Sequence, residues 1–163
     1  MISDTPTTLA LDTTSDGFSF VVLQGSETLL DWACSQVGRK KPAQWRRRVV
    51  QLIERYDPDL LVLANAEEPR RGRWIKRFTL DMESLANERG IAVRHVSRFE
   101  VREMFADSGT TKYKIALAIT RMFPELEPRL PRERKPWMSE DKRMSIFDAV
   151  SFALVALRQP VEK

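Results

Sequence analysis

A run of four consecutive apolar residues, Leu60 to Leu63, constrains the fold of this chain more than any other feature. Such a short, unbroken run is typical of a strand that is covered on both faces, as in parallel or mixed sheets. Before and after it, apolar residues recur with the helical period over residues 42–56 and 73–88. Pro58 ends the first of these helices before the strand begins. We therefore expect an α/β protein.

The first part of the chain predicts three strands joined as an antiparallel meander. Residues 8–12 and 18–23 are β-rich runs separated by turn-forming residues, and a third run, residues 28–36, follows the turn around Gly25. A fifth strand is expected over residues 91–95, after a glycine that ends the preceding helix. The result is a five-stranded mixed sheet, a three-strand antiparallel meander plus two further strands, flanked by helices.

Three further helices are expected over residues 97–105, 111–123 and 140–157. Between the last two, residues 124–138 hold four prolines among charged residues, which predicts a Pro-rich loop without regular structure. At 163 residues and 42% apolar side chains, the chain is long enough to bury one core. It contains no internal repeat and no linker composition, so residues 1–163 are expected to form a single domain.

Basic residues outnumber acidic ones by 27 to 23, and many of them are clustered. Dense basic clusters favour a polyanionic partner such as nucleic acid, although a solvated helix face explains each cluster taken alone. The three clusters lie within residues 39–48, 70–77 and 129–135.

Cys34 is the only cysteine and His95 the only histidine. This excludes an internal disulfide and leaves too few soft ligands for a structural zinc site, so any metal is expected to be a hard cation held by oxygen. The sequence also lacks a signal-type N-terminus and any apolar run of about 20 residues. We therefore expect a cytoplasmic protein that does not enter a membrane.

Acidic residues stand where a strand and a helix can present them together. Asp12 ends the buried run at residues 8–12, and Asp148 lies on the apolar last helix, behind Glu140 and Asp141. Carboxylates that meet from a strand and a helix are how metal-dependent nucleases hold their divalent cations. The pattern therefore predicts an acidic metal site.

This element order, with Asp12 on the first strand and Asp148 on the last helix, resembles the ribonuclease-H-like fold and, within it, the RuvC-type Holliday-junction resolvases. Residues 9–17 (LALDTTSDG) are similar to the family's first strand and turn, and residues 148–154 (DAVSFAL) to its last helix. The resemblance covers nearly the whole chain. It implies that Asp12 and Asp148 are catalytic metal ligands.

The resemblance further implies a structure-selective DNA endonuclease that uses two Mg²⁺ (or Mn²⁺) ions to hydrolyse phosphodiester bonds in branched DNA, in recombination and repair. It implies a homodimer, because symmetric cutting of a four-way junction needs two active sites, and we expect the helix at residues 73–88 to form the dimer surface. Lys112 and Lys114 are similar in position to the basic residue that resolvases place near the scissile phosphate. We take Lys114 as the catalytic candidate, with a solvated helical turn as the other interpretation.

The chain differs from the family at two acidic positions. The family has an acid three residues before the helical aspartate, where this chain has Ser145, and a glutamate at the end of the fourth strand, where this chain has Ala64. Glu140, Asp141 or a water would have to replace the first acid. Asp141 can reach the site because residues 141, 145 and 148 share a helix face; its other interpretation is a charge that stabilises the helix N-terminus. Glu67 is the expected replacement for the second, unless a ligand has been lost and the nuclease is weak or inactive.

Three aromatic residues lie among the arginines. Trp74, Phe78 and Trp137 could stack on unpaired bases of an opened junction, or they could pack within the protein.

The sequence supports two other functions. A non-catalytic nucleic-acid-binding domain on the same scaffold is consistent with Ala64 and Ser145. Nucleotide binding is the second, because residues 9–14 followed by a hairpin also resemble the opening of the sugar-kinase and actin-like ATPase folds. The chain has 6 glycines and no glycine-rich loop, which argues against nucleotide binding.

Overall fold

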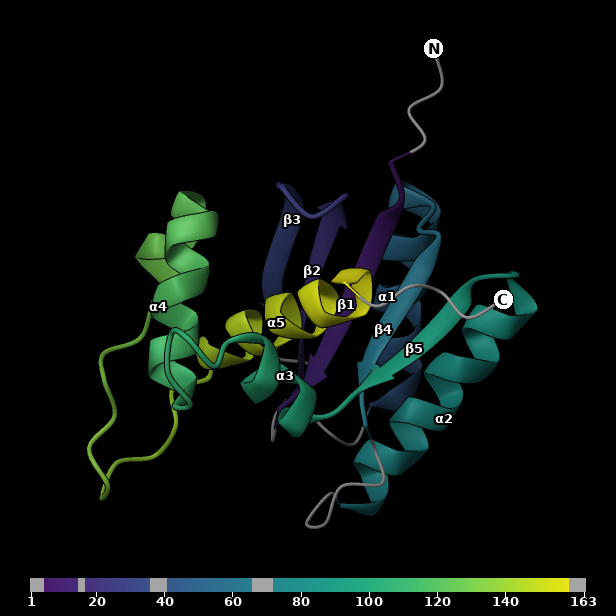
Figure 1. Ribbon diagram of the computed structural model, residues 1–163. Coiled ribbons are helices and arrows are strands. Elements are labelled where there is room, and N and C mark those ends of the chain that lie inside the picture. The colour runs from purple at the N-terminus through teal and green to yellow at the C-terminus, as the bar shows by residue number, and fades with distance from the viewer. Residues whose placement is uncertain (1–4, 15–16, 36–40, 66–71, 159–163) are drawn as a thin grey trace.

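The computed structural model describes residues 5–14, 17–35, 41–65 and 72–158. Five strands form one mixed sheet with the order β3-β2-β1-β4-β5, as Figure 1 shows. Strand β1 is antiparallel to β2 and parallel to β4, which in turn is parallel to β5. The strands are β1 (Thr7–Thr13), β2 (Phe18–Gln24), β3 (Thr28–Ser35), β4 (Leu60–Ala64) and β5 (Ala92–Val96). The predicted meander and the predicted five-stranded mixed sheet are confirmed.

Helices cover both faces of this sheet. They are α1 (Pro42–Tyr56), α2 (Arg73–Glu88), α3 (Arg98–Met104), α4 (Lys112–Met122), the 3-10 helix η1 (Pro124–Arg129) and α5 (Met144–Arg158). Successive side chains of a strand point to opposite faces, so Leu9 and Leu11 pack with α1 and α2, whereas Ala10 packs with the core around α5. In Figure 1, α5 crosses one face of the sheet and α1 lies behind the other.

Helix α5 is the centre of the core on the Ala10 face of the sheet. All but two of its 15 residues are buried, because it packs between the sheet on one side and α3 and α4 on the other. It begins at Met144, so the predicted start at residue 140 is wrong. The Asp141 carboxylate accepts a hydrogen bond from the Arg143 backbone N–H at 2.9 Å, and the Asp141 carbonyl accepts one from the Met144 N–H at 3.0 Å, so residues 141–144 form a tight turn that leads into the helix.

The Pro-rich segment at residues 124–138 is more ordered than expected. Pro124 opens η1, and Leu126 is fully buried within it, so the segment is anchored at its start. The prediction of a segment without regular structure is therefore wrong for residues 124–129. Residues 130–143, all of which the structure describes, form turns and extended chain without a helix or a strand.

In the described part of the chain, the helices are too short or too polar to cross a membrane.

Candidate metal and phosphate site

The predicted acids lie at the edge of the sheet where the parallel strands end. Strands β1, β4 and β5 run in one direction, so their carboxyl ends meet at this edge, which is where open α/β sheets bind their ligands. Asp12 stands at the end of β1, and Asp148 faces it from the first turns of α5. Both are well buried, with exposed fractions of 7% and 6%.

A cavity of about 550 Å³ opens at this edge. Its lining is unusually charged, with four carboxylates and three cationic side chains. Trp74 and Ile75 of α2 and Ser145 of α5 complete one wall. The charged lining residues are Asp12, Glu140, Asp141, Asp148, Arg98, Lys112 and Lys142.

Asp12 is tied to α5 by a hydrogen bond. The Ser145 hydroxyl donates to Oδ2 of Asp12 at 2.8 Å, and both side chains are buried. Ser145 and Asp148 are one helical turn apart and therefore lie on the same face of α5. The structure thus brings Asp12 and Asp148 to one pocket, and Ser145 stands where the family resemblance led us to look for an acid.

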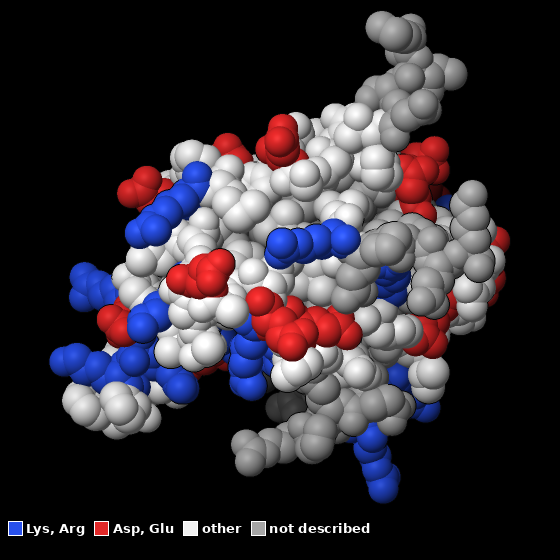
Figure 2. Space-filling model, viewed as in Figure 1, with Lys and Arg blue, Asp and Glu red and all other residues white. Residues whose placement is uncertain are grey.

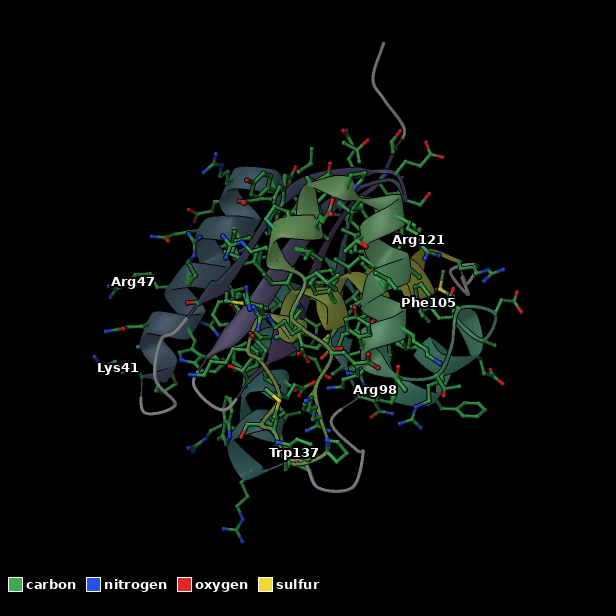
Figure 3. All side chains as sticks on the ribbon, turned by 90° about the vertical axis from the view of Figure 1, so that its left-hand side faces the viewer. Lys41, Arg47, Arg98, Phe105, Arg121 and Trp137 are labelled. Carbon is green, nitrogen blue, oxygen red and sulfur yellow. The ribbon has the colours of Figure 1, made fainter. Side chains whose placement is uncertain are left out.

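Asp148 is held by two cations. Arg98 donates from Nη2 to one carboxylate oxygen at 2.7 Å, and Nζ of Lys112 lies 3.3 Å from the other. Lys112 also reaches Glu140 at 2.7 Å, so it bridges two acids. The guanidinium of Arg98 lies over the ring of Phe152, 5.8 Å from its centroid. Figure 3 labels Arg98 in the same lower part of the molecule as Trp137.

The electrostatics of this cluster keep Arg98 charged. Burial by itself lowers the pKa of a guanidinium, but the carboxylates of Asp148, Asp12 and Glu140 outweigh burial and raise the pKa of Arg98 above its ordinary value. Arg98 was not among the sequence-predicted site residues. The only local signal is its place directly after β5 and the N-cap Ser97, whose hydroxyl accepts a hydrogen bond from the Glu100 N–H at 3.2 Å.

Asp141 lines the same cavity but is engaged by Arg143. Nη2 and Nε of Arg143 donate to its carboxylate at 2.9 and 3.2 Å. The hydrogen bond from this side chain lowers the pKa of Asp141 below its ordinary value. Because α5 begins at Met144, Asp141 does not share a helical face with Ser145 and Asp148, and that expectation is wrong.

The structure treats the two lysine candidates differently. Lys112 enters the cavity, whereas Lys114 is outside its lining. The backbone N–H of Lys114 donates to Oγ1 of the N-cap Thr111 at 3.2 Å, and its side chain packs beside Gly109. Glu67 lies outside the described residues. Ala64 ends β4, and the backbone N–H of the following Asn65 donates to the carbonyl of Val96 at 2.9 Å.

Of the three aromatic residues, two pack within the protein and one is exposed. Phe78 is buried, and Trp74 and Phe78 both contact Trp45, with ring centroids 5.0 and 4.8 Å away. These two therefore pack between α1 and α2. Trp137 is 79% exposed, on a turn closed by a hydrogen bond of 2.9 Å from the Met138 N–H to the Lys135 carbonyl.

The donor chemistry of the cavity fits a hard divalent cation, because carboxylate oxygens are the ligands that Mg²⁺ and Mn²⁺ prefer. Asp12 and Asp148 are the two acids that would hold it. A group of three or more His, Cys, Asp or Glu side chains placed to share a metal ion does not occur among the described residues.

Comparisons with known proteins find likeness in structure alone. No protein-family model and no curated protein matches the sequence. Solved structures that resemble the fold include two of a bacterial RuvC and one of a yeast resolvase. RuvC of Thermus thermophilus in complex with a Holliday junction substrate superimposes with a TM-score of 0.69, 15% identity and 93% coverage of both chains. A second structure of T. thermophilus RuvC gives a TM-score of 0.66, with the same identity and coverage.

The yeast mitochondrial Holliday junction resolvase Ydc2 gives a TM-score of 0.53 at 12% identity, covering 97% of this chain and 80% of its own. The five-stranded sheet, its strand order and its flanking helices agree with these structures. The chain therefore has the ribonuclease-H-like fold of the RuvC-type Holliday-junction resolvases.

Proposed function

We propose that this protein is a Mg²⁺-dependent endonuclease that hydrolyses phosphodiester bonds in branched DNA. The observation that carries the proposal is the meeting of Asp12 from β1 and Asp148 from α5 at one charged cavity, on a fold shared with Holliday-junction resolvases. Buried acids at the carboxyl ends of strands have a chemical use there, whereas burying them for packing alone would be costly.

The residues of the cavity have different roles in the proposed hydrolysis. Asp12 and Asp148 are the side chains that hold the cation, which when bound supplies an activated water and offsets charge on the leaving oxygen. We assign Lys112, which bridges Glu140 and Asp148, to the scissile phosphate. The oxygen of water forms a bond to phosphorus, the bond to the sugar oxygen breaks, and that oxygen takes up a proton.

The path of the DNA is supported by the distribution of basic residues. A second cavity, of about 590 Å³, lies under residues 130–143 and shares Lys112, Glu140 and Asp141 with the first. It is also lined by Arg132 and Arg134. Figure 2 shows basic side chains gathered at the lower left, where Figure 1 places α4 and this segment. We assign the backbone of the DNA to this surface.

Arginines of the basic cluster within residues 39–48 make contacts with other parts of the protein. Arg46 of α1 pairs with Asp81 and Glu88 of α2, at 2.6 and 3.3 Å, and so joins two helices. Arg48 lies over the ring of Phe20, 5.3 Å from its centroid. These contacts make α1 a weaker candidate for the DNA surface than residues 130–143.

Cutting both strands of a junction symmetrically requires two sites, so the proposal includes a homodimer. Helix α2 is the surface that we assign to it. Leu80 on this helix is 65% exposed and would be covered in such a dimer. The mass of the protein in solution, measured by light scattering for the natural chain and for Leu80→Glu, tests this assignment.

A non-catalytic branched-DNA-binding domain is the second candidate. It is favoured by Ala64 and Ser145, which stand where acids are expected, and by the two cations already paired with Asp148. Such a domain would bind a junction through the same basic surface and leave it intact.

Cleavage of a synthetic four-way DNA junction, compared with a linear duplex of the same sequence, separates the two candidates. We expect Mg²⁺ or Mn²⁺ to support cutting of the junction by the natural chain, and Asp12→Asn and Asp148→Asn each to abolish it. Asp107→Asn is the matched control, because Asp107 is exposed and lies outside the cavity. Junction binding without cutting would establish the non-catalytic candidate, and the absence of both would refute the two together.

A further inference from the structure

Arg98 is the best-held cation of the site. Its side chain is 20% exposed, against 40% for Lys112. On one side it donates to Asp148 at 2.7 Å, and on another it lies over Phe152, a fully buried residue of α5. The N-cap Ser97 fixes the first turn of α3, from which Arg98 extends. Packing against Phe152, the ion pair with Asp148 and the capped helix all hold the Arg98 side chain in the site. A more exposed lysine can swing away from its partner more easily.

The charges of the cavity limit what else can enter it. Among the described residues, its four carboxylates face three cationic side chains, so little negative charge is left over there. Two divalent ions would bring four further positive charges into a partly buried site, where like charges repel strongly. One divalent ion is compatible with the acids that are present. The guanidinium of Arg98 also takes a carboxylate oxygen of Asp148 that a second ion would need.

We propose that Arg98 is a built-in cation that takes the place of one of two divalent ions, so that the site binds a single ion, centred on Asp12. The inference rests on the proposed function and deepens it. Arg98 is a positioning residue in this scheme, because it acts through the carboxylate of Asp148. It fixes that side chain and supplies positive charge permanently, whatever the metal concentration.

The test is a titration with Mn²⁺ in the absence of DNA, with free Mn²⁺ followed by electron paramagnetic resonance and the heat by calorimetry. We expect one ion per chain for the natural protein. Arg98→Met should bind two ions, with the first bound more tightly by about tenfold or more, because a fixed positive charge has been removed from its neighbourhood. Arg102→Met is the matched control, since Arg102 is an exposed arginine on the same helix, and it should bind as the natural chain does.

A second pair of variants keeps the inference testable if Arg98→Met does not fold, as judged by circular dichroism. Asp12→Asn should abolish binding of the single ion. Asp148→Asn should still bind one ion but with lower affinity, because Asp148 contributes one ligand oxygen while Arg98 holds the other. Two ions in the natural chain, no ion at all, or identical binding by the natural chain and a folded Arg98→Met would each overturn the inference.

These results are independent of the cleavage assay. One bound ion without junction cleavage would support the role of Arg98 and refute the nuclease. Cleavage by a natural chain that binds two ions would support the nuclease and refute the role of Arg98.

Discussion

Arg143 holds Asp141 through both its backbone and its side chain. The backbone N–H and the guanidinium together donate three hydrogen bonds to one carboxylate, with lengths between 2.9 and 3.2 Å. This pair lies directly before α5 and at the rim of the charged cavity. It therefore controls whether Asp141 is available to anything that enters the cavity.

The pKa of Asp141 should rise towards its ordinary value in Arg143→Gln, which removes the guanidinium but keeps the backbone hydrogen bond. In the natural chain the folded-state pKa is lowered, so the pair contributes stability above the unfolded-state pKa and loses it as the pH falls through the folded-state pKa. Because the carboxylate is 40% exposed, solvent screens the effect to less than about 1 kcal/mol. Carboxyl chemical shifts followed by NMR between about pH 2 and 6 measure the pKa in both proteins. An unchanged pKa in the variant would contradict the assignment.

Ser145→Ala should destabilise the fold. The substitution leaves a buried oxygen of Asp12 with one donor fewer, which costs about 1 to 3 kcal/mol. Urea unfolding followed by circular dichroism measures this change. Ser139→Ala is the control, because Ser139 is exposed and its loss should change stability by less than about 0.5 kcal/mol. Equal stabilities for both variants would mean that the Ser145 hydrogen bond contributes nothing.

Arg134→Gln should affect DNA binding, whereas Arg46→Gln should affect stability. Arg134 lines the cavity under residues 130–143, so its loss should weaken binding to junction DNA and lower the salt dependence of log K by about 0.9. Arg46 pairs with acids of α2, so its loss should lower stability by about 1 kcal/mol or less and leave the salt dependence unchanged. Fluorescence anisotropy at several salt concentrations gives both slopes. The reverse outcome would move the DNA surface to α1.

Trp137→Ala should weaken binding to a junction with unpaired bases by about 1 to 3 kcal/mol, the effect of losing one stacked base. Trp137→Phe should retain most of the affinity, because it keeps an aromatic face. A fully paired linear duplex is the comparison ligand, and its binding should change little. The exposure of Trp137 and the Lys135 ammonium, 5.5 Å from its ring centroid, support this expectation. Equal losses on both DNAs would assign Trp137 to backbone contact instead.

The sheet could be predicted because the hydrophobic pattern of its strands is that of strands covered by helices on both faces. The unbroken run at residues 60–63 becomes the buried strand β4, and the alternation of Leu9 and Ala10 feeds two separate cores. The start of α5 could not be predicted from the same kind of pattern. Acids at residues 140 and 141 are typical of a first helical turn, but Asp141 lies in the turn that precedes the helix, where its carboxylate accepts from the Arg143 N–H.

The candidate site was predictable in part. Asp12 and Asp148 lie at one cavity, as a strand-borne and a helix-borne acid should, and their roles as ligands stay predictions. The roles of Glu67, Asp141 and Lys114 stay predictions as well. Arg98 was missed because it lies on a helix with a second arginine, Arg102, and the sequence does not show which of the two turns inward. Only the packing of α3 against α5 decides this.

The hydrogen bond between Asp12 and Ser145 joins residues 133 positions apart in the chain. During synthesis, β1 leaves the ribosome long before α5, and the cavity has no second wall until α5 has packed on the sheet. A chain that lacks α5 has neither Asp148 nor Ser145, so Asp12 loses both this hydrogen-bond donor and the acid that faces it, even if the meander has already folded. The site is therefore assembled only when α5 packs on the sheet.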